Sequence, residues 1–576
     1  MEALQECNSS VLTKKSMEND DVLEEILADS DSDMSSDSSE EDEMDEVDEG
    51  RPKNASKSKI YFRSGWTEAA SNWRRKPPVY RAGGQTGAMH RAHWQHFTPL
   101  QIFQLFFTQA VWELMVTETN RYAEQSLLEK PSSQPSRWEP TTIPGMMAFV
   151  ALLVCMGLNR RPQYTMYWSR CDILHSAIYP RTMSRNRFLA LLKYFHLTNN
   201  QEHQSTDTSP DKLAKVRQFL QTVVPSFLRN YRPGPNLSPD ETMIKFKGRL
   251  GFKQYMPKKR TKWGMKCFSL NESDTGYTLA WTVYTGLHSH APSNDSETQT
   301  EGGHPTTIPK PGQVVLELLS GLENRGHSIF ADNWYSSPAL VHKLTQQGFG
   351  YCGTVKHTTQ GVPHFANPKE FPMTKTEKPR FYEKSGQLCI VWQDKKRVTL
   401  LTNFGDCSVT IKRVRCRNSP TGYRDTNKPS AVLEYNKNMG GADLASQQCT
   451  YYAHVHRSVK WWKRVFFAIL DICILNSAIV YNDLNRNSKL CSLQFRLNLI
   501  QGLLSTWKCQ GRCELANTVR VSQGTQHYPG KNVAGKKQNC SVVCSTKARR
   551  KQTRTICKQC NKPMCMLRCF EKFHSQ

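Results

Sequence analysis

Three aspartates, far apart in the chain, stand in contexts from which a metal site can be built. Asp240 lies in the segment LSPDETMIKFKGR, Asp332 ends HSIFAD, and Asp443 follows YNKNMGG. Each one alone is more simply explained as a surface acid, so the hypothesis depends on the set. Three clustered carboxylates cannot all stay ionised without a cation, and oxygen-only ligands suit Mg²⁺ or Mn²⁺. Two such ions can promote displacement at phosphorus, so the set predicts metal-dependent cleavage and transfer of phosphodiesters.

The elements around these aspartates can bring them together. From Leu237 the pattern predicts three strands, then a helix, a strand, a second helix closed by glycine, and a strand at YCGTVK. This order predicts a mixed sheet covered by helices and resembles the RNase H-like fold. In that fold the first strand lies beside the later parallel strand, so Asp240 and Asp332 should converge, with the helix of Asp443 laid across them. Because strand side chains alternate between faces, we expect Glu241 to point away.

The flanking segments are predicted to be mainly helical. Residues 98–230, and the later segment VKWWKRVFFAILDICILNSAIVYNDL, carry apolar residues at three- and four-residue spacing. We interpret their Met and aromatic stripes as core. Residues 351–427 contain the hairpin-like GQLCIVWQDKKRVTLLTNF, which indicates an inserted or appended β-rich element.

The charge of the chain favours a polyanionic partner. The formal net charge is +26, and residues 18–50 contribute 17 negative charges and no positive ones, so the remainder carries +43. Such an excess favours nucleic acid, because Lys and Arg release counterions from phosphates. We find no apolar run near the roughly 20 residues that a spanning helix needs and no signal peptide, so we expect a soluble intracellular protein without a membrane partner.

The first 60 residues are rich in Ser, Asp and Glu and should be disordered, since they cannot bury enough apolar surface. Phosphorylation of their serines would let this tail compete with DNA; a solubility tail is an equally good interpretation.

Basic residues cluster after Asp240 and can follow DNA phosphates, although such runs are often only solvated surface. The segment PKKR also resembles a nuclear localisation signal, so we expect a nuclear protein. The predicted DNA contacts in this cluster are Lys259, Arg260 and Lys262.

The last 37 residues have the composition of a zinc module. Thiolate and imidazole ligands in short paired spacings suit tetrahedral Zn²⁺, and so short a segment has no other core. RING and PHD fingers use comparable patterns, but Arg549, Arg550 and Lys551 in the inserted KARRKQTR favour DNA. Seven ligands are one short of two sites, and His527 is our candidate eighth. The seven are Cys540, Cys544, Cys557, Cys560, Cys565, Cys569 and His574.

Several of these segments, taken in order, resemble the piggyBac transposase family. The resemblance runs from about residue 95 to the C-terminus and includes LSPDETMIKFKGRLGFKQYMPKKRTKWGMK, FADNWYSSPAL and EYNKNMGGADLASQQ. It implies that Asp240, Asp332 and Asp443 are catalytic and that Trp462 in VKWWKRV contacts the transposon end. Its neighbour Trp461 is interpreted as packing, and an equally good interpretation is that both tryptophans are helix core. Many members have a fourth acid where this chain has Ser446.

The resemblance also implies an α/β architecture: an RNase H-like core with an inserted β-rich domain, a helical dimerisation and DNA-binding domain split around the core, and a C-terminal zinc module. The predicted divisions are a disordered region at 1–90, helical parts at 91–236 and 453–509, core parts at 237–350 and 428–452, an insertion at 351–427, a linker at 510–539 and the zinc module at 540–576.

The implied function is a homodimeric transposase that binds the terminal repeats of a transposon in double-stranded DNA, cleaves with Mg²⁺ or Mn²⁺, and joins ends at TTAA. The alternative is a domesticated DNA-binding or chromatin protein with the same fold and little nuclease activity. A glycoside hydrolase using the Asp240–Glu241 pair is disfavoured by the charge and the zinc module.

Overall fold

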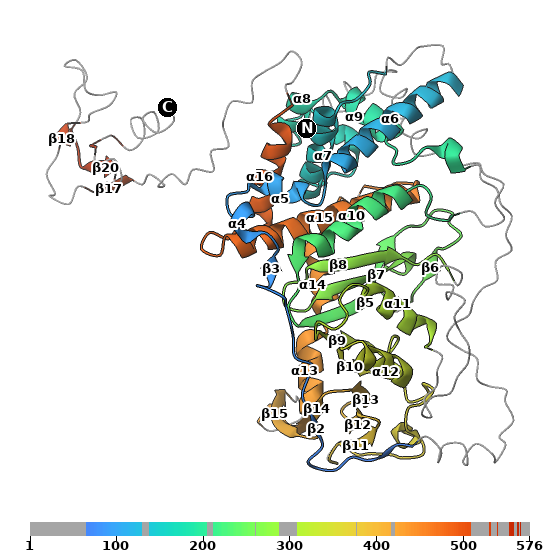
Figure 1. Ribbon diagram of the computed structural model, residues 1–576. Coiled ribbons are helices and arrows are strands. Elements are labelled where there is room, and N and C mark those ends of the chain that lie inside the picture. Colours follow the sequence, from blue (N-terminus) through green and yellow to red (C-terminus); the bar gives the residue numbers. More distant parts are fainter. Residues whose placement is uncertain are drawn as a thin grey trace, which may run out of the picture. The chain divides into compact units, whose positions relative to one another are not determined.

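Figure 1 shows the computed structural model of the chain, which divides into two compact units, residues 1–508 and 509–576. The structure describes residues 65–129, 138–203, 211–257, 259, 261–286, 308–375, 377–415, 421–454, 456–507, 529–531, 538–539, 552–557, 562, 563 and 565.

A ten-stranded mixed sheet forms the centre of the first unit. Its strands follow the order β1-β11-β12-β13-β10-β9-β5-β7-β6, and β8 also pairs with β7. At its middle, β5 pairs antiparallel with β7 and parallel with β9, and β9 pairs parallel with β10. The strands around the site are β5 (Asn236–Lys245), β6 (Gln254–Tyr255), β7 (Trp263–Glu272), β8 (Thr278–Val283), β9 (Ser328–Ala331) and β10 (Gly350–Thr354).

The predicted order of elements is confirmed for this part. Helix α11 (Lys310–Leu318) follows β8, and helix α12 (Pro338–Gln346) connects β9 to β10. Ser337 caps α12 by accepting from the Leu340 amide, with Pro338 in its first turn, the combination that favours a helix start. Among the described residues of this segment, the structure adds the two-residue β6 between the first two predicted strands.

The segment expected to be an insertion continues the same sheet. Antiparallel pairing of β13 with β10 joins it to the central strands, so the predicted boundary at residue 350 falls inside β10. The added strands are β11 (Arg380–Lys384), β12 (Gln387–Gln393) and β13 (Arg397–Thr402). Beside them β14 (Gly405–Asp406) pairs with β2 (Arg74–Arg75), and β15 (Val409–Arg415) forms a ribbon with β16 (Tyr423–Pro429).

Residues 65–90, which we predicted to be disordered, are part of the folded unit. The strand β1 (Thr67–Glu68) pairs with β11 at one end of the sheet, and β3 (Gly87–Ala88) pairs with β4 (Tyr231–Arg232). Trp66 is buried, and its indole N–H donates to the Gly361 carbonyl at 2.7 Å. The acidic composition that favours disorder is confined to residues 18–50 and does not extend to residues 65–90.

The predicted helical segments are confirmed, and their aromatic stripes are core. Phe107 and Phe219 pack against Phe466, which joins the early helices to the late ones. In the order of the chain the helices are α4 (Arg91–Trp94), α5 (Pro99–Gln104), α6 (Gln109–Glu129), α7 (Ile143–Leu158), α8 (Ile178–Thr182), α9 (Arg185–Tyr194), α10 (Arg217–Asn230), α13 (Ser430–Asn438), α14 (Gly441–Tyr451), α15 (Trp461–Leu484) and α16 (Ser492–Leu504), with short 3₁₀ segments at Tyr164–Trp168, Asn200–His203 and His364–Ala366.

Helix α15 corrects the expectation that no apolar run approaches the length of a membrane span. Among the described residues, α15 is the one helix whose length and apolar composition would allow it to cross a membrane. However, 72% of its most apolar 18-residue stretch is buried inside the protein. The burial identifies it as a core helix.

In the second unit, the described residues form two short antiparallel pairs. Strand β17 (Pro529–Lys531) pairs with β20 (Thr555–Cys557), and β18 (Gln538–Asn539) pairs with β19 (Gln552–Thr553). Parts of the predicted linker are therefore paired with the cysteine-rich segment.

Candidate active site

Asp240 and Glu241 lie next to each other on β5, in the middle of the sheet. Their exposed fractions are 7% and 9%. In the β5–β7 register, Asp240 faces Ser269 and Glu241 faces Phe268. Pairing with the parallel neighbour β9 is confined to Asn236 and Leu237. Beyond Leu237 the β5 backbone no longer pairs with β9, so Asp240 and Glu241 lie on a stretch of β5 that has no strand partner on that side.

Asp332 comes directly after β9 and meets the β5 carboxylates. Its Oδ1 accepts from the Trp334 amide at 2.9 Å, which fixes the side chain at the turn after the strand. One carboxylate oxygen each from Asp240, Glu241 and Asp332 lie within 4.8 Å of one another. The convergence of Asp240 and Asp332 is the one predicted from adjacent parallel strands.

Glu241 is placed in this cluster, contrary to our expectation. We reasoned that adjacent strand residues point to opposite faces and cannot share a site. The Asp240 side chain instead turns along its own backbone, where Oδ1 accepts from the Glu241 amide at 2.7 Å. A short carboxylate that bends in this way can reach the same region as the next side chain, so alternation does not separate the two. We refer to Asp240, Glu241 and Asp332 as the carboxylate cluster.

Asp443 lies near the cluster but outside it. It is exposed, in the first turn of α14, and it interacts electrostatically with Lys259. Helix α14 packs on β5 and β7, and Gly441 makes this approach possible, since a Cβ there would lie 2.7 Å from Ser238 Oγ and from the Glu272 carbonyl oxygen. Ser446 follows Asp443 by three residues and is partly exposed.

Two lysines flank the carboxylate cluster. Lys259 Nζ lies 3.0 Å from Glu241 Oε1. Lys266, which is 9% exposed, has its Nζ 3.8 Å from the centre of the Trp334 ring. Sequence reasoning missed Lys266; its signal is a lone cation within the otherwise apolar strand MKCFSL.

Burial and these charges set the protonation of the cluster. Burial and the neighbouring Glu241 raise the pKa of Asp240 to about 7. Burial alone would raise the pKa of Glu241, but its contacts with Lys259 outweigh burial and lower it. Burial raises the pKa of Asp332 and lowers that of Lys266. Burial and mutual repulsion thus disfavour full ionisation of the carboxylates without a cation, and their all-oxygen donor set fits a hard divalent cation.

The other predicted DNA contacts are placed only in part. Lys262 is exposed just before β7, whereas Arg260, Arg549, Arg550 and Lys551 lie outside the described residues.

Trp462 does not present its ring for a DNA contact. It is 1% exposed and packs against Phe195 and His196, with ring centroids 5.8 and 5.0 Å away. Its neighbour Trp461 is partly exposed and meets Phe252 edge-to-face at 5.3 Å. The expectation that Trp462 contacts DNA is therefore wrong, and its interpretation as helix core is confirmed; of the two rings, only that of Trp461 is partly exposed.

Two of the predicted zinc ligands are described. Cys557 is buried at the end of β20, and its amide donates to the Lys562 carbonyl at 3.0 Å. Cys565 is partly buried. The remaining predicted ligands, which lie outside the described residues, are Cys540, Cys544, Cys560, Cys569, His574 and His527.

The chain is similar to transposases and to proteins derived from them. The family model described as "Transposase IS4" matches residues 98–478. Human PiggyBac transposable element-derived protein 2 is 24% identical over 412 residues, which are 70% of this chain and 64% of that protein. Human PiggyBac transposable element-derived protein 5 is 24% identical over 466 residues, or 77% of this chain and 81% of that protein. The chain thus spans slightly less than two thirds of the first relative.

A solved structure shares the fold. The cryo-EM structure of a piggyBac transposase synaptic complex with hairpin DNA matches with a TM-score of 0.62 and 24% identity, covering 84% of this chain and 98% of that one. Since the family match extends over more than half of the chain, through the strands and helices that carry Asp240, Asp332 and Asp443, the chain belongs to the piggyBac-type transposase family.

Proposed function

We propose that this chain binds DNA and cleaves and joins its strands with the help of divalent metal. The observation that carries the proposal is the carboxylate cluster, three acidic side chains with oxygens within 4.8 Å of one another. Two lie on β5, and the third directly follows its parallel neighbour β9. Membership of a transposase family, and the likeness to a transposase structure with hairpin DNA, support DNA as the substrate.

The residues of the site have separate tasks in this proposal. Asp240, Glu241 and Asp332 would hold Mg²⁺ or Mn²⁺, and Asp443 would join them when DNA is bound. The metal would supply an activated oxygen nucleophile and stabilise the leaving oxygen. Lys259 and Lys266 place positive charge beside the carboxylates, where they can attract the phosphate and offset the negative charge around it.

We further propose that β5 and β7–β10, with α11, α12 and α14, form an RNase H-like core. Three antiparallel strands followed by two parallel crossovers support this assignment. The helical parts before and after the core would mediate homodimerisation and binding to terminal repeats, with the segment from the end of β10 to residue 427 inserted between core segments. The unit after residue 508 would hold Zn²⁺ through the cysteine and histidine set named above. The chain would act in the nucleus, without a membrane partner, and join ends at TTAA.

A second candidate is a domesticated DNA-binding protein with little or no nuclease activity. It is favoured by the human relatives, which are named transposable element-derived proteins, and by Ser446, where many members have an acid.

Strand cleavage by the purified full-length chain separates the two candidates. The substrate is a duplex with cognate terminal repeats, tested with Mg²⁺ and with Mn²⁺. Wild type should nick the ends, and Asp332→Asn should abolish nicking while end binding, measured in EDTA, changes by less than about threefold, since basic contacts supply most of the affinity. Binding without nicking by wild type supports the second candidate. A wild-type chain that binds no DNA contradicts both.

A further inference from the structure

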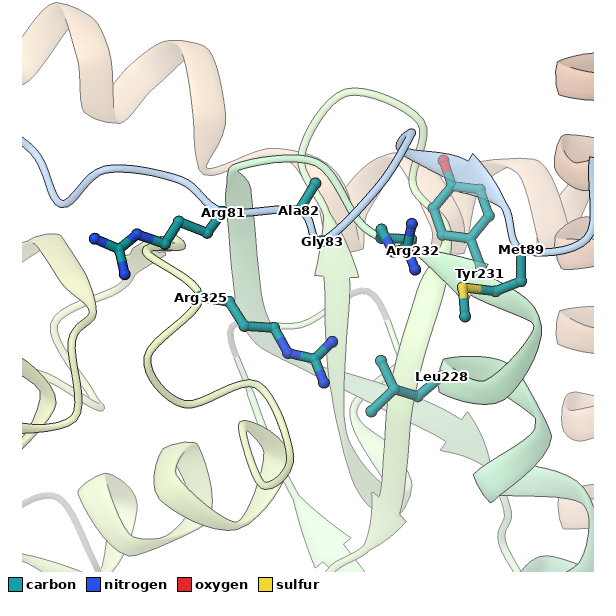
Figure 2. Close-up of a pocket in the computed structure, with 8 residues that line it drawn as sticks. All are labelled: Arg81, Ala82, Gly83, Met89, Leu228, Tyr231, Arg232 and Arg325. Carbon is teal, nitrogen blue, oxygen red and sulfur yellow. The ribbon is translucent and has the colours of Figure 1, made fainter.

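A pocket of about 400 Å³ lies on the first unit away from the carboxylate cluster (Figure 2). Three of its lining residues are arginines, Arg81, Arg232 and Arg325, and its apolar and aromatic lining comes from Met89, Leu228 and Tyr231. Figure 2 shows Arg325 extending toward Leu228, while Arg81 extends away from the other two. We call this the arginine pocket.

The arginine pocket is assembled from three distant segments that are locked together. The Arg81 amide donates to the Arg325 carbonyl at 2.8 Å, and the Tyr80 hydroxyl donates to the Pro233 carbonyl. Gly326 packs against the same segment, since a Cβ there would lie 2.2 Å from the Val79 carbonyl oxygen. These contacts tie the segment before β3 to the loops that precede β5 and β9. The arginine backbones are therefore held in place before any ligand binds.

A glycine makes room for one of the guanidinium groups. Gly84 has φ +149°, and a Cβ there would lie 2.0 Å from Arg232 Nη1. The Arg232 side chain thus lies directly against the backbone of the Gly83–Gly84 turn. Any side chain at residue 84 would displace the guanidinium from the pocket.

The three arginines have no acidic partner within the described part of the chain, where no salt bridge involves Arg81, Arg232 or Arg325. Glu272 is an acid in this region, since it interacts electrostatically with Tyr80, as Arg232 and Arg325 also do. Its carboxylate already accepts from the Tyr231 hydroxyl at 2.8 Å and from the Gly234 amide at 2.6 Å. The guanidinium groups therefore remain available to an external anion.

The chemistry of the arginine pocket selects a phosphate ester. The planar guanidinium fork matches phosphate oxygens and binds them in pairs, and the apolar surface of Met89 and Leu228 can accept the sugar or base that an ester carries. The pocket lies where the chain enters β5 and β9, whereas Asp332 follows the other end of β9. At about 3.3 Å per residue the separation is on the order of 20 Å, so a phosphate here is not the reacting one.

We propose that the arginine pocket is a second phosphate-binding site, which holds either a DNA phosphate remote from the reacting one or a free phosphate ester. The DNA alternative rests on the proposed function, and the free ester does not.

The test compares Arg232→Gln/Arg325→Gln with Arg74→Gln/Lys395→Gln, a control that removes the same charge at exposed positions elsewhere. Binding to a labelled duplex is measured in EDTA across a salt series. Losing two phosphate contacts should flatten the log–log salt slope by roughly 1.8 and weaken binding at least tenfold relative to the control. In parallel, inorganic pyrophosphate should raise the melting temperature of wild type and control but not of the pocket variant. Arg325→Gln alone, at an exposed position, gives half the slope change if the double variant folds poorly.

The outcomes separate the sources. A change in the DNA series, with or without a change in the pyrophosphate series, assigns the site to DNA. A change with pyrophosphate alone assigns it to a free phosphate compound. If the pocket variant matches the control in both series, the proposal is overturned. Wild type that fails to bind DNA contradicts the proposed function, while the pyrophosphate series still decides the arginine pocket.

Discussion

Replacing Trp462 by alanine should damage stability rather than DNA recognition. The ring is 1% exposed and packs against Phe195 and His196, so its removal leaves a large cavity beneath α15. Truncating a buried tryptophan costs about 3–5 kcal/mol, which lowers the folding equilibrium constant by roughly two to four orders of magnitude. Trp461 is only partly buried and makes one edge-to-face contact with Phe252, worth about 0.5–1.5 kcal/mol beyond its buried area.

The assay is urea denaturation of both variants, followed by far-UV circular dichroism over the main unfolding transition, with DNA-end binding measured on the folded fraction. Trp462→Ala should shift the midpoint strongly and bind normally per folded molecule. Trp461→Ala should shift the midpoint less and weaken end binding, since base stacking contributes about 1–3 kcal/mol. A stable Trp462→Ala chain that has lost end binding would refute the assignment of the two rings.

Three further predictions test other parts of the account. Gly441→Ala should lower cleavage at least tenfold, because its Cβ would lie 2.7 Å from Ser238 Oγ and would move Asp443 away from β5. The control Gly440→Ala should be nearly neutral, since no atom lies within 4 Å of its Cβ. Equal cleavage rates in the two variants would count against the docking of α14. Cys557→Ser should lower the zinc content of the purified full-length chain, measured by mass spectrometry, because the thiolate is a predicted ligand; unchanged zinc would remove Cys557 from the set. Ser446→Asp should leave cleavage unchanged or increase it, since an added acid near Asp443 strengthens cation binding, and a loss of cleavage would contradict this.

Much of the fold could be predicted, because the spacing of apolar residues indicates each strand and helix, and the order of these elements indicates the fold. Strand and helix signals from Leu237 to Lys356 gave the observed sequence of β5, β7, β8, α11, β9, α12 and β10. The pairing of β13 with β10 could not be predicted, because a hairpin pattern indicates which strands are neighbours in the chain and not which distant strand they join. Residues 65–90 were misjudged because pairing with β11 and the burial of Trp66 depend on tertiary contacts that composition does not report.

The site was predictable at the level of backbone position and not of side-chain direction. Adjacent parallel strands bring Asp240 and Asp332 together, as their contexts indicated. The inclusion of Glu241 depends on the bend of the Asp240 side chain toward its neighbour's amide, which strand alternation does not encode. Likewise, the pattern WW could not show which ring faces the core, since that depends on how α15 is rotated against Phe195.

Mn²⁺ affinity, measured by calorimetry on the DNA-free chain, tests the central claim that Asp240, Glu241 and Asp332 hold a divalent cation. Asp332→Asn and Glu241→Gln are compared with Asp172→Asn, an exposed aspartate outside the cluster. Any Mn²⁺ bound elsewhere is common to all variants. We predict that Asp332→Asn and Glu241→Gln each weaken Mn²⁺ binding by roughly tenfold or more, while Asp172→Asn matches wild type. Equal Mn²⁺ affinity in all four proteins would contradict the assignment of the carboxylate cluster as the metal site.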